Sequence, residues 1–556
     1  MARIGPRLVL MLVLLLGLGA VLAQQRGGTA TILMPEDLAT MNPYATTALI
    51  TMQVVPALLE PLVGVDPDGA YYPILAREVP TPANGGVADE GRTITWRLKE
   101  GVTWSDGTPF TSDDVVFTAE AAAAGEGGSV RAGAFGGIAS ITALDDYTVE
   151  VRYQEYDASY LDQFQWGILP RHATGDPAAM SSWGFARAPV GTGPFVLEAW
   201  RTGDRIVMAR NEAFREDGKP YLDGLEFLVV PSEETRSAMM QRGDAQVMLW
   251  PGPQLRTVWE ETPGVTLDSA PEIWVLRMFL NLGERGNPTE GQAPHPILGD
   301  VRVRQALALG IDYDLIIDEL AEGRVLRARS PFELGWYRCD VDAYAYDPGR
   351  AASLLDEAGW AMGDDGVRVA QGAPYAADGT RLALDMTGYT DFRLLEQTEL
   401  VIADLWGDLG IETSVRNVEQ SVLFGGWSDR AARKTGEFDI LVYDTGAGIN
   451  PQLHVFELLH SSRIPREQNE GAGGNYARWS NPRVDDLLEL AGRTPGLDER
   501  REAYCEIAEI VNEELPHLYL YQFAGGNAYA ERLENFHTST WAGLVWNVAD
   551  WWLATE

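Results

Sequence analysis

The side chains that most often carry out chemistry are few in this chain, or they lack the spacing that catalysis requires. The six histidines (172, 295, 454, 460, 517 and 537) show no metal-ligand spacing, and His454 and His460 do not share one helical face. The sequence contains no G-x-x-x-x-G-K-[ST], G-x-S-x-G, H-E-x-x-H or C-x-x-C motif. Carboxylate pairs of the kind that glycosidases use arise by chance among 81 acidic residues, so a secreted hydrolase stays an alternative. The pattern favours binding over catalysis and predicts no cofactor.

Aromatic residues are the unusual positive feature, with 17 tryptophans and 20 tyrosines. In a binding pocket such side chains stack on sugar rings or pack against peptide side chains. Most of them are expected in the core, and a few are expected to contact a ligand.

The charge of the chain argues against nucleic acid as a partner. It carries 43 basic and 81 acidic residues, a net charge of −38, and its lysines are Lys99, Lys219 and Lys434 alone. A phosphate backbone requires a basic face. The acid excess is typical of a self-repelling, soluble surface, and recognition of a cationic ligand is the alternative.

The first 23 residues have the three parts of a secretory signal peptide. Arg3 and Arg7 precede the apolar run at 8–18, and Val21-Leu22-Ala23 offers a small-residue cleavage site before Gln24. Eleven apolar residues are too few to span a bilayer of about 30 Å. No cysteine lies near the cut, so we expect an exported protein without a lipid anchor.

The elements that would position a site alternate between strands and helices, which indicates an α/β fold. Short strands are expected at 30–34, 93–98, 148–153 and 195–200. Thr111 followed by Asp114 predicts a capped helix, and Asp347-Pro348 with Gly359 frames another over 346–360. Further helices are expected at 301–311 and 499–515. The two cysteines, Cys339 and Cys505, permit either one disulfide or two buried thiols.

Several segments, in order along the chain, resemble family 5 extracellular solute-binding proteins, the dipeptide, oligopeptide and nickel receptors of ABC importers. The strand, turn and helix of residues 96–120, with Gly101 to Phe117 matching throughout, resemble the signature region of that family. Supporting matches lie at 41–43, 189–200, 224–247, 302–312, 346–360 and 516–522.

The resemblance implies a two-lobed fold of the type II periplasmic-binding-protein kind with an extra inserted domain. Lobe I would comprise 24–62, 190–285 and 518–556, domain II 63–189, and lobe III 286–517. The implied function is capture of di- or oligopeptides between the lobes and delivery to a membrane permease with its ATPase, by a monomeric periplasmic receptor. Oligosaccharide receptors of the same family and nickel or metal-chelate capture are the alternatives.

The resemblance also implies which residues line the ligand site. In the peptide receptors an aspartate in a G-W-x-x-D-x-x-D/E-P segment holds the amino terminus of the peptide. Alignment on Pro451 places Ala447 at that aspartate and Asp444 at the tryptophan, so either Asp444 serves after a local shift or the ligand has no free amino group. The expected ligand contacts are Trp250, Pro251, Trp274, Phe279, Asn281, Tyr443, Asp444 and Thr445.

Overall fold

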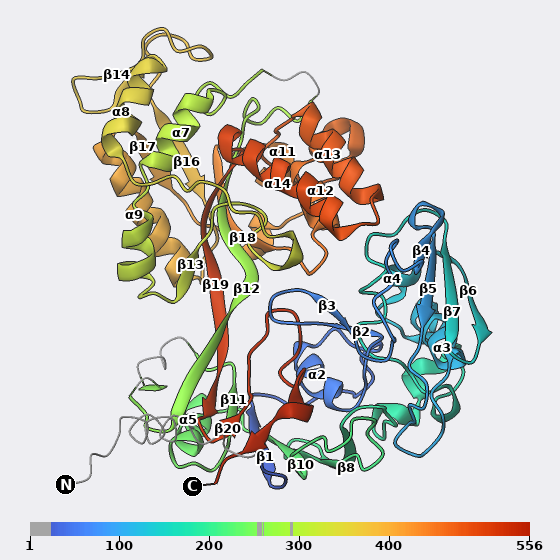
Figure 1. The fold of residues 1–556 in the computed structure, drawn as a ribbon. Coiled ribbons are helices and arrows are strands. Elements are labelled where there is room, and N and C mark those ends of the chain that lie inside the picture. Colours follow the sequence, from blue (N-terminus) through green and yellow to red (C-terminus); the bar gives the residue numbers. More distant parts are fainter. Residues whose placement is uncertain (1–23, 253–257, 260, 290–292, 556) are drawn as a thin grey trace, which may run out of the picture.

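The computed structural model describes residues 24–252, 258–259, 261–289 and 293–555, so the expected signal peptide lies outside the described residues. An upper and a lower lobe are joined by two long antiparallel strands, β12 (Val265–Leu280) and β19 (His517–Ala530) (Figure 1). A side domain lies beside the lower lobe. This arrangement is the α/β, two-lobed fold that the sequence predicts.

One sheet runs through both lobes, because β12 and β19 contribute to each of them. Its order is β17-β16-β18-β12-β19-β11-β1-β10-β9-β8, with β13 paired to β19. Its parallel pairs are β1 with β10 and β11, and β16 with β17 and β18.

The lower lobe and the side domain are built from the N-terminal half of the chain and its C-terminal end. The lower lobe contains β1 (Thr29–Met34), α2 (Leu49–Val54), β8 (Phe195–Arg201), β9 (Arg205–Arg210), β10 (Gly224–Val229), α5 (Glu233–Gln241), β11 (Val247–Leu249), β20 (Leu533–Glu534) and β21 (Trp552–Leu553). The side domain contains β2 (Val63–Val65), β3 (Tyr71–Pro73), β4 (Val87–Ala88), β5 (Thr93–Arg97), α3 (Ser112–Ala123), α4 (Ala132–Phe135), β6 (Ile138–Asp145) and β7 (Thr148–Tyr153).

The upper lobe is continuous in sequence between the two long strands. Its strands are β13 (Val325–Arg327), β14 (Trp360–Met362), β15 (Arg368–Ala370), β16 (Ala383–Thr387), β17 (Glu412–Val415) and β18 (Ile440–Gly446). Its helices are α7 (Val301–Leu309), α8 (Pro348–Glu357), α9 (Arg393–Asp408), α10 (Gln420–Leu423), α11 (Ala432–Thr435), α12 (Gln452–Leu459), α13 (Pro482–Arg493) and α14 (Leu497–Glu514).

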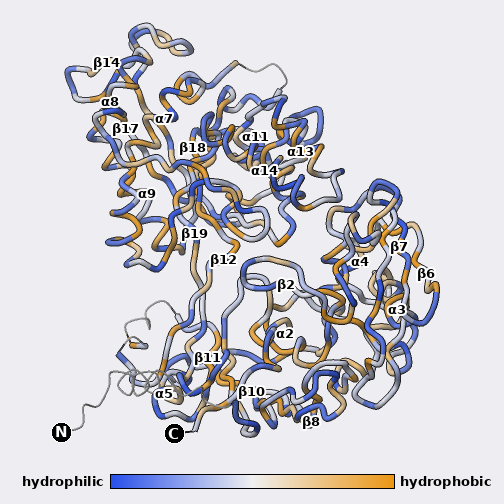
Figure 2. Tube along the Cα trace, in the orientation of Figure 1, coloured by the Kyte–Doolittle hydropathy of each residue, from blue (hydrophilic) through white to orange (hydrophobic). Residues whose placement is uncertain are grey.

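Each lobe has its own hydrophobic core. One cluster lies in the upper lobe, and a second joins the lower lobe to the side domain, from Ile32 of β1 to Trp96 of β5. Figure 2 shows hydrophobic residues following the strands inside both parts of the molecule. Because a shared core resists separation, the side domain and the lower lobe are expected to move as one body.

The strands cross between the lobes at an irregular point. Pro271 pairs with Ala524 and Val275 pairs with Gln522, so three residues of β12 lie opposite one residue of β19. Such a bulge bends a strand and redirects its side chains. The crossing lies several residues from the expected boundaries at 285/286 and 517/518, and that division of the chain remains a proposal.

The capped helices predicted from the sequence are confirmed. Thr111 and Asp114 form a reciprocal capping box at the start of α3, and the Asp347 carboxylate accepts from the Arg350 N–H at the start of α8. In the signature stretch, Trp96 and Trp104 are fully buried, and the Trp104 indole donates to Asp114 at 3.2 Å. This stretch is therefore scaffold of the side domain.

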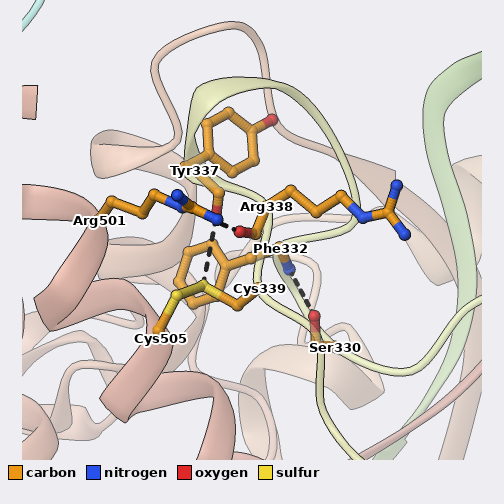
Figure 3. Close-up of a disulfide and its surroundings, with 7 residues drawn as sticks. All are labelled: Ser330, Phe332, Tyr337, Arg338, Cys339, Arg501 and Cys505. Atoms are coloured by element: carbon orange, nitrogen blue, oxygen red, sulfur yellow. Dashed lines mark hydrogen bonds between the residues drawn. A yellow bond between two sulfur atoms is a disulfide. The ribbon is translucent and has the colours of Figure 1, made fainter. Parts of the chain in front are cut away.

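The two cysteines form a disulfide, which settles the alternative that the sequence left open. Cys339 follows the short helical turn η9 (Gly335–Tyr337), and Cys505 lies in α14 (Figure 3). Arg501 of the same helix donates to the Arg338 carbonyl at 3.2 Å. The disulfide therefore joins the η9 loop to α14 within the upper lobe.

Candidate ligand-binding cleft

Two hollows share Trp274 in their linings, and we call them together the hinge cleft. The lower hollow, of about 330 Å³, is lined by Leu49 and Gln53 of α2, by Trp250, by 270–274 of β12, by 525–527 of β19 and by the 538–544 segment. The upper hollow, of about 480 Å³, is lined by Trp274, 443–446 of β18, and residues of α11, α12 and the 473–476 loop. Both volumes suit small-molecule sites.

The tryptophans expected at the site do face the cleft. The exposed fractions are 39% for Trp250 and 46% for Trp274, which is unusual for side chains of this size. Trp250 has a left-handed backbone (φ 47°), as few non-glycine residues do. Its neighbour Pro251 is half-buried and lines neither hollow.

Phe279 and Asn281 lie elsewhere, inside the upper lobe. Phe279 is fully buried and stacks on Tyr443 with ring centroids 4.4 Å apart. The buried Asn281 amide donates to the carbonyls of Gly436 and Phe438 at 3.1 and 2.9 Å. Neither residue lines the cleft, so their side chains support the sheet.

Tyr443, Asp444 and Thr445 all line the upper hollow, at the end of β18. Tyr443 is buried, and Asp444 and Thr445 are half-buried. The Tyr389 hydroxyl donates to Asp444 Oδ1 at 2.7 Å, and this bond together with burial raises the pKa of Tyr389. Ala447, which replaces the aspartate of the peptide-receptor pattern, is buried just beyond the strand.

A second carboxylate, Glu272, lies close enough to sense the charge of Asp444. Burial and the Asp444 charge together raise the pKa of Glu272. Glu272 belongs to the three-residue bulge and lies against Gly525 of β19, where an added Cβ would be 2.1 Å from its Oε1. Among the described residues neither carboxylate forms a salt bridge, although each lies at the cleft.

The lining of the upper hollow also contains two basic residues, Arg433 and Lys434, together with the acid Glu457. Lys434 Nζ donates to the carbonyls of Gly471 and Gly473 at 3.0 and 2.9 Å, and burial lowers its pKa. The Arg433 guanidinium lies over the rings of Phe424 and Tyr476, 5.3 Å from each centroid. The lining of the cleft thus combines the acids Glu272 and Asp444 with the bases Arg433 and Lys434, and the charge of Glu457 acts on Lys434.

A buried arginine lies behind the floor of the upper hollow. Arg277 of β12 is 2% exposed, and its Nη2 donates to the Thr445 carbonyl at 3.2 Å. Burial and the Arg277 charge lower the pKa of His454 to about 3, so His454 is neutral and its Nε2 lies 3.3 Å from Thr445 Oγ1. These contacts hold the end of β18 in place.

Sequence reasoning missed the residues contributed by loops and by the bulge. Glu272, Gln53, Arg433, His454 and Tyr476 line the cleft without a local motif to mark them. Lys434 could have been selected from the sequence, because the chain contains only three lysines.

In the part of the chain that the structure describes, no group of three or more His, Cys, Asp or Glu side chains is placed to hold a metal ion. Within the same described residues, no helix is both long and apolar enough to cross a membrane.

Two lobes with separate cores, joined by two strands beside a cleft, define a hinged ligand-binding protein. A family model described as "Bacterial extracellular solute-binding proteins, family 5 Middle" matches residues 54–464. The chain belongs to this family, which the sequence analysis identified, and it is a solute receptor rather than an enzyme.

Curated relatives and solved structures extend the match over nearly the whole chain. The chain is 25% identical to the oligopeptide-binding protein AppA of Bacillus subtilis, over 84% of this chain and 82% of that protein. It is 27% identical to the dipeptide-binding protein of Escherichia coli, over 78% of each. The structure of HbpA2 from Haemophilus parasuis shares the fold, with a TM-score of 0.78 at 18% identity, over 95% of this chain and 100% of that one.

Proposed function

We propose that this protein is the extracytoplasmic receptor of an ABC importer and that it captures peptides with a free amino terminus in the hinge cleft. The observation that carries the proposal is the pair of carboxylates, Asp444 and Glu272, which lie at the cleft without a salt bridge to any described residue. Holding two partly buried carboxylates within reach of each other's charge is costly unless a cation offsets their repulsion. A peptide ammonium supplies the missing cation.

The two basic residues of the upper hollow suit the other end of a zwitterion. Arg433 and Lys434 line the same hollow as Asp444. A peptide bound with its ammonium at Asp444 would direct its carboxylate or its acidic side chains toward them. The names of the relatives, an oligopeptide-binding and a dipeptide-binding protein, support the same ligand class.

An oligosaccharide is the second candidate, and one observation favours it. Trp250 and Trp274 present large exposed rings to the lower hollow, and such rings stack on sugars. The acidic pair gives a neutral sugar no comparable advantage, so we place peptides first.

The proposal includes export and delivery. We infer that the leader is removed after Ala23 and that the mature protein acts as a monomer, handing its ligand to a membrane permease. The intact mass of the exported protein should equal that of a chain that begins at Gln24. A mass that includes residues 1–23 would contradict this.

Calorimetric titration of the ligand-free protein tests the ligand class. The three titrants are a tripeptide, its N-acetylated twin and a β-linked oligosaccharide. We expect one molecule of the free tripeptide to bind and the acetylated twin to bind far more weakly, because acetylation removes the cation. Equal binding of the two tripeptides would exclude the ammonium contact, and binding of the oligosaccharide alone would exclude a peptide receptor.

A further inference from the structure

The upper lobe touches the rest of the molecule at a second place, away from the two crossing strands. Gly69, in the turn between β2 and β3 of the side domain, lies directly against Gly335 of the η9 loop; a Cβ added to Gly69 would be 2.4 Å from the Gly335 Cα. Trp541 of the C-terminal segment packs edge-on against Tyr337, with ring centroids 6.3 Å apart. Both contacts join the η9 loop to the lower half of the molecule.

Arg500 is the charged centre of this second contact. It lies near the start of α14 and is 1% exposed. Its Nη2 donates to Asn450 Oδ1 at 2.8 Å and to the Tyr504 hydroxyl at 3.1 Å, both within the upper lobe. Its Nη1 lies 3.4 Å from the carbonyl of Ala158, which belongs to the side domain. The guanidinium therefore spans the two halves.

The side domain presents an electronegative face to this guanidinium. The Tyr71 hydroxyl donates to Asp162 Oδ1 at 2.7 Å, and burial raises the pKa of Asp162 to about 7. The positive charge of Arg500 acts in the opposite direction and favours a lower pKa of Asp162. It acts in the same way on the pKa values of Tyr71 and Tyr156. If the lobes separated, Arg500 would lose its contact with Ala158 and this favourable field.

The disulfide assembles the upper side of the contact. It links the loop that carries Gly335 and Tyr337 to the helix that carries Arg500. Trp336 belongs to that loop, and its ring centroid lies 5.0 Å from the Arg500 guanidinium. The two parts that touch the side domain are therefore joined covalently as well as by packing.

We propose that this contact is an interlobe latch, with Arg500 as its positioning residue, and that it stabilises the arrangement in which the lobes touch before any ligand binds. Rotation about the crossing strands that separates the lobes must break the latch. The latch thereby sets the fraction of ligand-free molecules that are ready to close, and the apparent dissociation constant varies inversely with that fraction. The inference does not depend on the class of ligand.

Two variants remove the latch from opposite sides, each with a matched control. Gly69→Asn keeps a residue that tolerates a left-handed backbone but inserts a side chain against the Gly335 backbone. Gly85→Asn makes the same change at a left-handed glycine of the same domain that has no atom within 4 Å of an added Cβ. Arg500→Ala removes the guanidinium, and Arg493→Ala makes the same change at an exposed arginine of α13 in the same lobe.

Single-molecule energy transfer in the ligand-free protein provides the measurement, with dyes on Ser182→Cys of the side domain and Ser353→Cys of the upper lobe, both exposed. We expect Gly69→Asn and Arg500→Ala to shift molecules to longer interlobe distances and to weaken ligand binding about tenfold. Gly85→Asn and Arg493→Ala should match the wild type. Should Arg500→Ala fail to fold, Gly69→Asn decides alone, and an unchanged distance distribution in that variant would overturn the latch.

Discussion

At the scale of single residues, the decisive feature is that Asp444 and Glu272 both line the cleft and that neither forms a salt bridge with a described residue, although the charge of the buried Arg277 acts on Asp444. Tyr389 donates to Asp444, and the Asp444 charge helps to raise the pKa of Glu272. A site of this kind favours a ligand cation because the cation relieves the repulsion between the two acids. The first two predictions follow from this pair.

Replacing Asp444 by Asn should weaken the binding of free peptides. Truncating one partner of a buried charge pair costs about 2–5 kcal/mol, which is roughly thirtyfold to several thousandfold in the dissociation constant. Calorimetry would measure the loss, with the exposed Asp364→Asn of the same lobe as the control. Under the oligosaccharide alternative the change removes at most one hydrogen bond, worth about 0.5–1.5 kcal/mol, and Trp274→Ala should weaken binding more. Tight peptide binding by Asp444→Asn would exclude Asp444 as the anchor.

Glu272 should make peptide affinity depend on pH. Its pKa is raised in the free protein, so it holds a proton at a pH where an ordinary glutamate has lost one. A bound ammonium favours the ionised form, so binding releases a proton and affinity rises with pH through this range. Titrations in buffers of different ionisation enthalpy would count the protons released. The Glu272→Gln variant should release fewer protons, and an unchanged count would contradict the assignment.

At the scale of secondary-structure elements, α9 carries a buried acid inside the upper lobe. Glu399 is fully buried, Asn417 Nδ2 donates to its Oε2 at 2.7 Å, and burial raises its pKa to about 7. Between pH about 5 and 7 the unfolded chain loses a proton that the folded protein keeps, so the free energy of unfolding falls as pH rises. Below this pH range Glu399 is protonated in both the folded and the unfolded chain. Above it the free energy of unfolding no longer changes with pH through this group.

Glu399→Gln should remove this pH dependence. The wild type should lose up to about 3 kcal/mol of its free energy of unfolding between pH 5 and 7 relative to the variant. Urea unfolding followed by circular dichroism at several pH values would measure the difference. Asp404→Asn, an exposed change on the same helix, should follow the wild type. Parallel pH profiles for Glu399→Gln and the wild type would show that Glu399 is ionised in the fold.

The sequence predicted elements whose signals are local. The capping box of α3 and the Asp347 cap of α8 lie within a few residues, and both are confirmed. It could not predict the bulge at 272–274, because that irregularity depends on how β12 pairs with β19, more than 240 residues away in the chain. For the same reason it selected Phe279, which the alternation of β12 directs into the core, and missed Glu272.

At the scale of the whole molecule, two bodies with separate cores are connected by β12 and β19 (Figure 1). Because the side domain shares its core with the lower lobe, ligand binding should rotate the upper lobe against both. X-ray scattering should show a smaller radius of gyration at saturation with peptide. An unchanged radius would contradict closure.

The central claim, that the hinge cleft selects peptides by their free amino terminus, is tested most directly by native mass spectrometry. The protein is unfolded to release any ligand, refolded, and equilibrated with a mixture of peptides, their N-acetylated counterparts and β-linked oligosaccharides. The account predicts one bound molecule per chain, drawn from the free peptides, and loss of this selection in Asp444→Asn. Selection of oligosaccharides, or equal capture of acetylated and free peptides, would contradict it.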